Sequence, residues 1–322
     1  MKISRLLNTL LISTAVLIPS TTMAEDIKKV AVSQIVEHPA LDSARMGILD
    51  GLAKRGYKEG SNLEFTFQTA QGNPAIAVQI ARQFVGEQPD VLVGIATPSA
   101  QALAAATKNI PIVFTAVTDP IGARLLTDMN KPSGNITGLS DLSPVFQHVA
   151  LAKEVLPEMK TIGVIYNPGE ANSVSLLALL KQAAAKYDLN VVEGTALRSA
   201  DVQSAAQIVA SKSDAIYALT DNTMGTALDS VVAVSNQAGI PVIAADTGFT
   251  ERGALVGLGF DYYQIGLETA EYVADILDGK SPNELPAKVA TGSDLFINKK
   301  AAQILKMQLP DSVVQRATKV IR

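Results

Sequence analysis

The chain has 322 residues, a formal net charge of −4 at neutral pH and no cysteine. The lack of cysteine excludes disulfides, thiolate metal sites, cysteine nucleophiles and an N-terminal thioether lipid anchor. The acidic balance leaves no basic field for nucleic acid, so we expect no nucleic-acid partner.

The first 24 residues have the pattern of a secretory signal peptide. Lys2 and Arg5 make the start basic, residues 6–19 are largely apolar, and small residues precede Glu25. The apolar run is shorter than the roughly 20 residues that span a bilayer, which favours cleavage over an uncleaved anchor. We therefore expect residues 1–24 to be removed, leaving a protein of the periplasm that is not a lipoprotein.

From residue 29 onward, short apolar runs alternate with longer runs rich in alanine and leucine. The pattern predicts strands over residues 30–32, 63–68, 90–95 and 111–117, and helices over 41–56, 74–85 and 98–107. Apolar strands that alternate with helices are typical of a parallel sheet covered on both faces.

Residues 132–135 interrupt this order, and a second series of similar size follows. It predicts strands over 161–166, 190–193, 214–219 and 241–245, and helices over 145–156, 172–187, 200–211 and 224–238. The remaining pattern predicts a strand over 255–260, a helix over 262–277, short strands at 289 and 296–297, and a last helix over 299–307. Elements left over after two α/β series suggest that the chain returns to complete the first lobe.

We therefore predict an α/β fold with two doubly wound parallel-sheet lobes joined by a multi-strand hinge. The expected N-terminal lobe comprises residues 25–139 and 259–290, and the expected C-terminal lobe comprises residues 140–258 and 291–322. Such folds bind ligands in the crevice beyond the carboxyl ends of their strands.

Polar residues gather in the segments that follow the expected strands, where they would face this crevice. The candidate ligand-binding residues are Ser33, Gln34, His38, Pro39, Thr97, Pro98, Ser99, Ala100, Val117, Tyr166, Asn167, Glu170, Asn172, Ser173, Asp221, Asn222, Thr223 and Asp246. The aromatic residues nearest to these segments are Tyr166, Phe249, Tyr262 and Tyr263.

Residues 97–101 are the expected seat of a carboxylate. We expect Thr97 to cap the following helix, Pro98 to fix its first turn, and the N–H groups of Ser99 and Ala100 to remain free for an anion. A plain helix cap accounts for the same residues and stays open as the alternative.

Asp221 and Asp246 are the expected partners of a ligand ammonium group, because an unpaired buried charge costs several kcal/mol. We rank Asp221, together with Asn222 and Thr223, ahead of Asp246. Helix capping is the alternative for both carboxylates.

The turn at residues 166–173 adds polar side chains, although Pro168 and Gly169 explain the turn without a ligand. His38 and Pro39 either form a wall over an aromatic ring or belong to an ordinary surface loop. No second histidine stands near His38 at ligand spacing, so no metal is expected. We interpret His148 as a packing residue.

Catalytic patterns are missing from the sequence. It has no Gly-x-Ser-x-Gly elbow and no Gly-x-x-x-x-Gly-Lys-Ser/Thr phosphate loop. A carboxylate pair such as Asp221 and Asp246 occurs in glycosidases, but acidic residues also bind polar ligands in clefts. We expect neither an enzyme nor a cofactor.

Several strings of residues carry a resemblance to a known family. They are residues 32–39 (VSQIVEHP), 94–101 (GIATPSAQ), 115–120 (TAVTDP), 133–138 (SGNITG) and 165–168 (IYNP). Through them the chain resembles the periplasmic substrate-binding proteins of ABC transporters, of the two-lobe type I kind, and most of all the subgroup for tryptophan, tyrosine or phenylalanine. The resemblance implies reversible capture of an aromatic amino acid by a monomer and its delivery to a membrane permease.

Other ligands and roles stay open at this point. The same fold binds sugars or other amino acids, and it also serves as a sensing module for membrane receptors. Sugar clefts usually stack the ring on tryptophan or phenylalanine, and this chain has no tryptophan. That difference favours an amino acid over a sugar.

Overall fold

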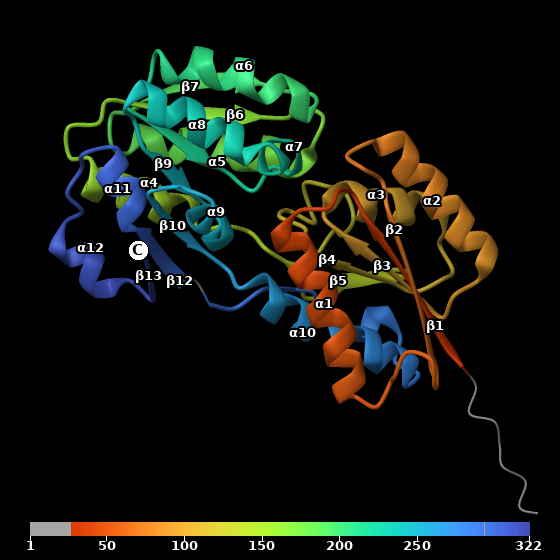
Figure 1. The fold of residues 1–322 in the computed structure, drawn as a ribbon. Coiled ribbons are helices and arrows are strands. Elements are labelled where there is room, and N and C mark those ends of the chain that lie inside the picture. Colours follow the sequence, from red (N-terminus) through yellow and green to blue (C-terminus); the bar gives the residue numbers. More distant parts are fainter. Residues whose placement is uncertain (1–26, 293) are drawn as a thin grey trace, which may run out of the picture.

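The protein, seen here in a computed structural model, forms two α/β lobes that lie side by side (Figure 1). The structure describes residues 27–292 and 294–322, so the expected signal peptide lies outside the described residues. The chain passes between the two sheets three times, after β5 (Ile136–Ser140), after β10 (Val256–Gly259) and between β11 (Lys288–Val289) and β12 (Asp294–Asn298). The prediction of two α/β lobes with a multi-strand hinge is confirmed.

The N-terminal lobe is built on a six-stranded parallel sheet in the order β11-β5-β4-β3-β1-β2. Its other strands are β1 (Lys28–Gln34), β2 (Leu63–Thr69), β3 (Val91–Ile95) and β4 (Ile112–Thr115). Its helices are α1 (Pro39–Lys54), α2 (Pro74–Glu87), α3 (Thr97–Ala106), α10 (Tyr262–Leu277) and the short 3₁₀ helix η1 (Pro282–Glu284).

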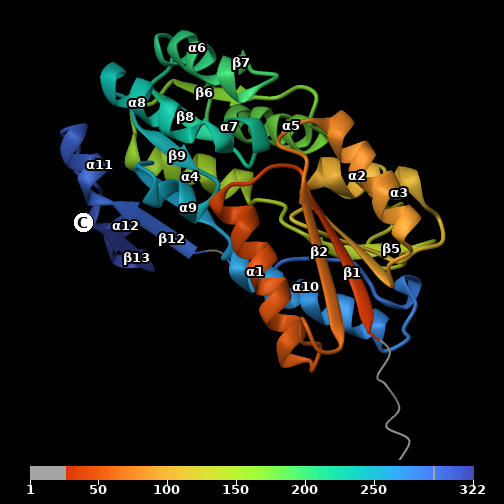
Figure 2. The same ribbon diagram turned by 45° about the vertical axis from the view of Figure 1, so that its right-hand side comes forward.

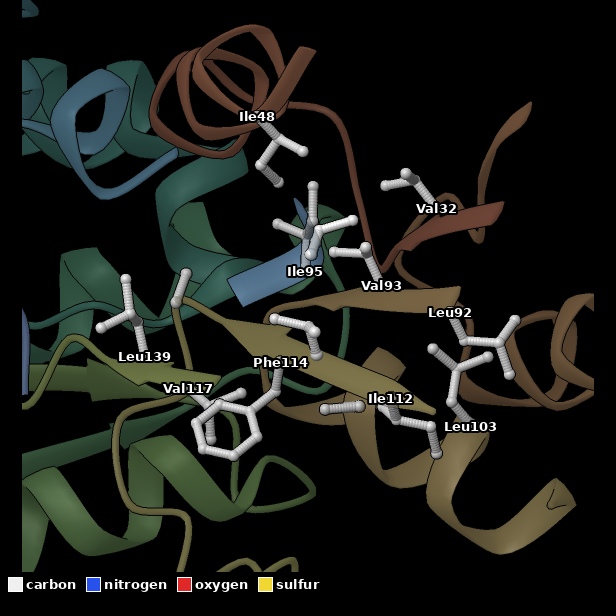
Figure 3. Packing of buried hydrophobic residues seen from close by; sticks show 14 of the residues in the cluster. Val32, Ile48, Leu92, Val93, Ile95, Leu103, Ile112, Phe114, Val117 and Leu139 are labelled. Atoms are coloured by element: carbon white, nitrogen blue, oxygen red, sulfur yellow. The ribbon is translucent and has the colours of Figure 1, made fainter. Parts of the chain in front are cut away.

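Buried aliphatic side chains fill both faces of this sheet. Figure 3 shows Ile48 of α1 on the same side as Val93 and Ile95, while Leu103 of α3 lies on the other side with Leu92. Strands that are apolar on both faces require helices on both sides, as the sequence pattern predicts.

The C-terminal lobe has a seven-stranded sheet in the order β13-β12-β10-β9-β8-β6-β7. Its strands, besides β10 and β12, are β6 (Thr161–Tyr166), β7 (Asn190–Thr195), β8 (Ala215–Ala218), β9 (Val242–Ala244) and β13 (Lys319–Ile321). Its helices are α4 (Val145–Val155), α5 (Ala171–Ala185), α6 (Ser199–Ala210), α7 (Asn222–Thr226), α8 (Leu228–Ala238), α9 (Thr247–Glu251), α11 (Lys299–Ile304) and α12 (Asp311–Arg316). The strand β12 runs antiparallel to β10, so this sheet is not purely parallel.

Some expected elements differ from the structure. The single helix expected over residues 224–238 is wrong, because the backbone leaves helical geometry at Ala227 and separates α7 from α8. The strand β5 is absent from the sequence prediction, since Gly138 and its polar neighbours look like part of a turn. The short elements α9, α12 and β13 are also additions to the expected order.

The helices α1 and α10 pack unusually closely (Figures 1 and 2). Gly47 and Gly266 face each other there, and a Cβ atom on Gly266 would collide with the backbone of Ala44 and Gly47. Both helices begin at the boundary between the lobes, so this contact fixes the positions of His38 and Tyr262 at the cleft.

Within the described ranges, no helix is both long enough and apolar enough to cross a membrane.

We predict that Gly266→Ala lowers the free energy of unfolding by about 1–3 kcal/mol, because the added methyl group overpacks the contact between α1 and α10. Gly86→Ala is the matched control. A Cβ atom on Gly86, which lies in α2, would have no other atom within 4 Å, so alanine should stabilise that helix by about 0.5–1 kcal/mol. Urea unfolding of both variants checks this, and equal effects would contradict it.

Candidate ligand-binding site

A small, partly open cavity of about 20 Å³ lies where the strand ends of the two sheets meet. This volume is close to the room needed by one water molecule. Residues of both lobes and of the hinge line the cavity. They are His38, Leu41, Ala116, Thr118, Asp141, Asn172, Thr220, Asp221, Asn222, Asp246, Phe249 and Tyr262.

Asp221 connects several segments that form the C-terminal wall of the cavity. As N-cap of α7, Asp221 accepts the Met224 N–H through Oδ1 at 2.6 Å. Its Oδ2 accepts the Asn167 N–H at 2.7 Å and the Ser173 hydroxyl at 2.6 Å. The capping alternative therefore holds for Asp221, although its carboxyl group also reaches the cavity.

Glu170 organises the rest of this wall. It accepts hydrogen bonds from the Asn222 side chain at 2.5 Å and from the Thr223 hydroxyl at 2.9 Å. The Asn172 amide donates to Glu170 at 3.2 Å. The buried residues Asn167, Glu170 and Ser173 and the half-buried Thr223 thus form a support behind the lining residues and do not line the cavity themselves.

Two further carboxylates stand at the hinge side of the cavity. Asp246 is the N-cap of α9 and accepts the Gly248 N–H at 2.6 Å, while no described side chain donates to it. Asp141 follows β5 and accepts the Thr118 hydroxyl at 3.1 Å and the Tyr262 hydroxyl at 2.7 Å. Sequence reasoning misses Asp141 because it misses β5, the strand that places this residue at the sheet edge.

These carboxylates are buried without a cation in the cavity wall. No lysine or arginine is among the described residues that line the cavity. Burial raises the pKa of Asp246 to about 7, with the charge of Asp141 adding to the rise and Arg252 opposing it. Burial and then the Glu170 carboxylate raise the pKa of Asp221 to about 7, and burial also raises the pKa of Asp141.

Buried hydroxyl groups lie at the strand ends of the N-terminal lobe. The Oγ atoms of Ser33 and Ser99 and the Oγ1 atom of Thr97 are buried and have no hydrogen-bond partner among the described residues. Contrary to expectation, Ser33 and Gln34 belong to β1 and not to the loop after it. None of these residues lines the small cavity in this closed arrangement.

The expected cap of α3 is wrong. Ala96 occupies the N-cap position with a φ of 71°, and the Thr97 side chain makes no capping hydrogen bond. The Ala100 N–H is not free either, because it donates to the Ala96 carbonyl at 3.1 Å. Pro98 lies in the first turn, as predicted.

Other candidate residues lie beside the cavity. Val117 is buried in the core of the N-terminal lobe, and its neighbours Ala116 and Thr118 line the cavity in its place. Pro39 lines a neighbouring surface groove. The Tyr166 hydroxyl points to Glu193 at 3.4 Å.

The two histidines have different surroundings. His38 lines the cavity, its Nδ1 has no described hydrogen-bond partner, and burial lowers its pKa to about 4. It is therefore neutral at pH 7. His148 is buried with its Nδ1 2.7 Å from the Tyr217 hydroxyl, which fits the expected packing role. The described residues contain no group of three or more acidic or histidine side chains that could hold a metal ion.

The structure brings five of the candidates to the cavity wall, namely His38, Asn172, Asp221, Asn222 and Asp246. The candidate ligand-binding residues do not include Leu41, Ala116, Thr118, Asp141 and Thr220, which also line the cavity. Phe249 and Tyr262, noted only as nearby aromatic residues, also line it. The wall thus offers carboxylates to a cation and aromatic and aliphatic surface to an apolar group.

Comparisons with known proteins agree on one family. The family model described as ABC transporter substrate binding protein matches residues 29–321. A tyrosine-binding protein of Clostridioides difficile is 38% identical over 281 residues, which cover 87% of this chain and 81% of the relative.

Three solved structures are also similar. A conserved domain protein of Vibrio cholerae has 64% identity and a TM-score of 0.91, covering 92% of this chain and 100% of that one. An ABC domain of Streptococcus pneumoniae in complex with L-Trp has 37% identity and a TM-score of 0.88, covering 91% and 99%. A ligand-free, open substrate-binding protein of Clostridium difficile has 37% identity but a TM-score of 0.69, covering 92% and 99%. At equal identity, the present arrangement is thus nearer to the L-Trp complex than to the open form.

We predict that Asp246→Asn stabilises the ligand-free protein in a pH-dependent way. Because folding raises the pKa of Asp246 from 3.8 to about 7, the wild-type protein loses stability as the pH rises through this window. Asparagine keeps the cap and removes the charge, so the free energy of unfolding should rise by about 1 kcal/mol or more at pH 8. Near pH 4 the two proteins should be alike.

Thermal unfolding of both proteins between pH 4 and pH 8 checks this. An equal difference in melting temperature at all pH values would contradict the assignment of a buried, ionisable Asp246.

Proposed function

The chain belongs to the family of ABC transporter substrate-binding proteins, and we propose that it captures an aromatic amino acid between its lobes for delivery to a membrane permease. Family membership and the resemblance to the aromatic amino acid subgroup, both predicted from the sequence, are confirmed. The lobe arrangement is the type I fold that solute-binding proteins of this kind share.

The distribution of polar groups around the cavity carries this proposal. We assign the ligand ammonium group first to Asp246, because no described side chain donates to its carboxylate. Asp141 also lines the cavity, and its charge acts on Asp246. Asp221 takes second place among the sequence-predicted candidates, since both of its oxygens already accept hydrogen bonds within the C-terminal lobe.

The ligand carboxylate is assigned to the N-terminal lobe. The hydroxyls of Ser33, Thr97 and Ser99 are buried donors without described partners, and buried polar groups are rarely left unpaired. They lie at the ends of β1 and β3, at the edge of the sheet that faces the other lobe. Hydroxyl donors on one lobe and carboxylates on the other match the two ends of a zwitterion.

The aromatic side chain would supply most of the affinity. Burying about 150–250 Å² of ring surface contributes roughly 4–6 kcal/mol, and a micromolar dissociation constant needs about 8 kcal/mol. Phe249, Leu41 and Tyr262 offer the apolar surface for this contact. Hydrogen bonds to the charged ends of the ligand would supply the remainder.

Lobe movement is part of this function. A cavity of about 20 Å³ cannot admit an amino acid, so the lobes must separate for entry and hold the ligand in a slightly wider closed state. The TM-scores of 0.88 and 0.69 against the L-Trp complex and the open relative support two such arrangements.

Proteins of this family act outside the cytoplasm. We further propose that this one works in the periplasm as a monomer after removal of residues 1–24, and that it makes and breaks no covalent bond. Both lobes and the cavity lie within a single chain, so binding needs no second copy.

We predict that L-phenylalanine, L-tyrosine or L-tryptophan raises the melting temperature of the protein, while the other amino acids and common sugars do not, because a ligand that binds only the folded state stabilises it. Asp246→Asn should weaken binding of the active amino acid at least about tenfold, since it removes a charge-assisted contact.

Isothermal titration calorimetry measures the affinity, and Asp311→Asn is the control because Asp311 is exposed on α12, away from the cavity. Binding of a sugar and of no aromatic amino acid would overturn the proposed function. Unchanged affinity of Asp246→Asn would overturn the assignment of the ammonium partner.

A further inference from the structure

A direct hydrogen bond joins side chains of the two lobes away from the hinge. The hydroxyl of Ser175 donates to Oδ2 of Asp119 at 2.9 Å. Ser175 lies on α5 in the C-terminal lobe, and Asp119 follows β4 in the N-terminal lobe. Neither residue lines the cavity.

The loop that carries Asp119 is well supported. Oδ1 of Asp119 accepts the Gly122 N–H at 2.8 Å, which leaves Oδ2 for the other lobe. The Gln101 side chain of α3 donates to the Ala123 carbonyl at 3.0 Å and ties the loop to its own lobe. The acceptor is therefore held in place before the lobes meet.

Both partners are next to cavity residues in the sequence. Asp119 follows Thr118, which lines the cavity and donates to Asp141. Ser175 lies one helical turn after Asn172, which lines the opposite wall. A contact between Ser175 and Asp119 therefore holds the two cavity walls at their closed separation.

We propose that Ser175 and Asp119 form an interlobe latch, a pair of positioning residues that prolongs ligand retention without touching the ligand. The apparent dissociation constant equals the intrinsic one divided by the fraction of protein in the binding-competent state. Losing the latch lowers the closed fraction and lets the lobes reopen sooner. The effect on ligand retention rests on the proposed function, whereas the effect on the closed fraction does not.

Gly122 gives a second way to break the latch from the other lobe. A Cβ atom at this position would collide with the Asp119 carboxylate and lie 3.2 Å from the Ser175 hydroxyl. Gly122→Ala should therefore displace Asp119 while leaving α5 unchanged. Ser175→Ala and Gly122→Ala change different lobes. If both open the cleft to the same extent, the cause is the lost latch and not a local defect in one lobe.

The test measures the distance between the lobes in single molecules. The chain has no cysteine, so Arg82→Cys on α2 and Gln207→Cys on α6 provide unique sites for a pair of fluorophores. Both residues are exposed and lie on different lobes. The variants are Ser175→Ala, Gly122→Ala and Ser175→Thr, which keeps the hydroxyl; Ser204→Ala, an exposed serine of α6, is the control.

We expect Ser175→Ala and Gly122→Ala to reduce the closed fraction of ligand-free protein. With the aromatic amino acid that binds the wild type, they should raise the dissociation constant about three- to tenfold, the range for the net loss of one ordinary intramolecular hydrogen bond. The change should lie mainly in the dissociation rate. Ser175→Thr and Ser204→Ala should stay within about twofold of the wild type.

A closed fraction and dissociation rate of Ser175→Ala equal to those of the wild type would overturn the latch. An effect confined to the association rate would overturn it as well, and so would failure of Ser175→Thr to restore the closed fraction. If the wild type bound no aromatic amino acid, the proposed function would fail, and the ligand-free closed fraction would still decide the latch.

Discussion

Carboxylates buried without a cation are the constraint on which the closed arrangement depends. Asp141, Asp221 and Asp246 are each almost fully buried, and the described cavity wall holds no lysine or arginine. Leaving a charge unpaired in such a place costs several kcal/mol. Closure must therefore be accompanied by a proton or by a cation from outside, and an amino acid brings one. The charge that opposes the empty closed state thus favours the loaded one.

A few features of the fold and its packing place these carboxylates at the cleft. Parallel strands direct their carboxyl ends to one edge of each sheet, so the polar residues that follow them meet across the cleft. The close contact of Gly47 with Gly266 joins α1 to α10 and positions the first residues of both helices. The Tyr262 hydroxyl then reaches Asp141, which connects two of the segments that cross between lobes. The same residues therefore belong to the cavity wall and to the hinge.

Much of the fold is predictable from the sequence, because apolar strands and amphipathic helices alternate in a clear period. The residues that line the cavity are harder to predict, because a shift of one residue along a segment changes which side chain faces the cavity. The sequence pattern favours Val117, which is buried in the core, whereas Thr118 beside it faces the cavity. Asp141 is missed because Gly138 makes the sequence of β5 resemble a turn. In the structure Gly138 has a φ of 150° and lies against the backbone of Phe114 in the neighbouring strand. Ala96 takes a left-handed cap that alanine seldom adopts, so composition points to Thr97 instead.

From the sequence, helix capping and ligand binding are alternatives for Asp221 and Asp246. In the structure both residues cap helices, so they differ in how many of their acceptor sites remain unused. Asp221 caps α7 and accepts from Asn167 and Ser173 as well, so little of its charge is left for a ligand. Asp246 also caps a helix, yet it receives no side-chain donor among the described residues. A helix N-terminus lowers the cost of burying a carboxylate without removing its need for a counter-charge. The cap that uses fewest donors is therefore the one best suited to hold an ammonium group.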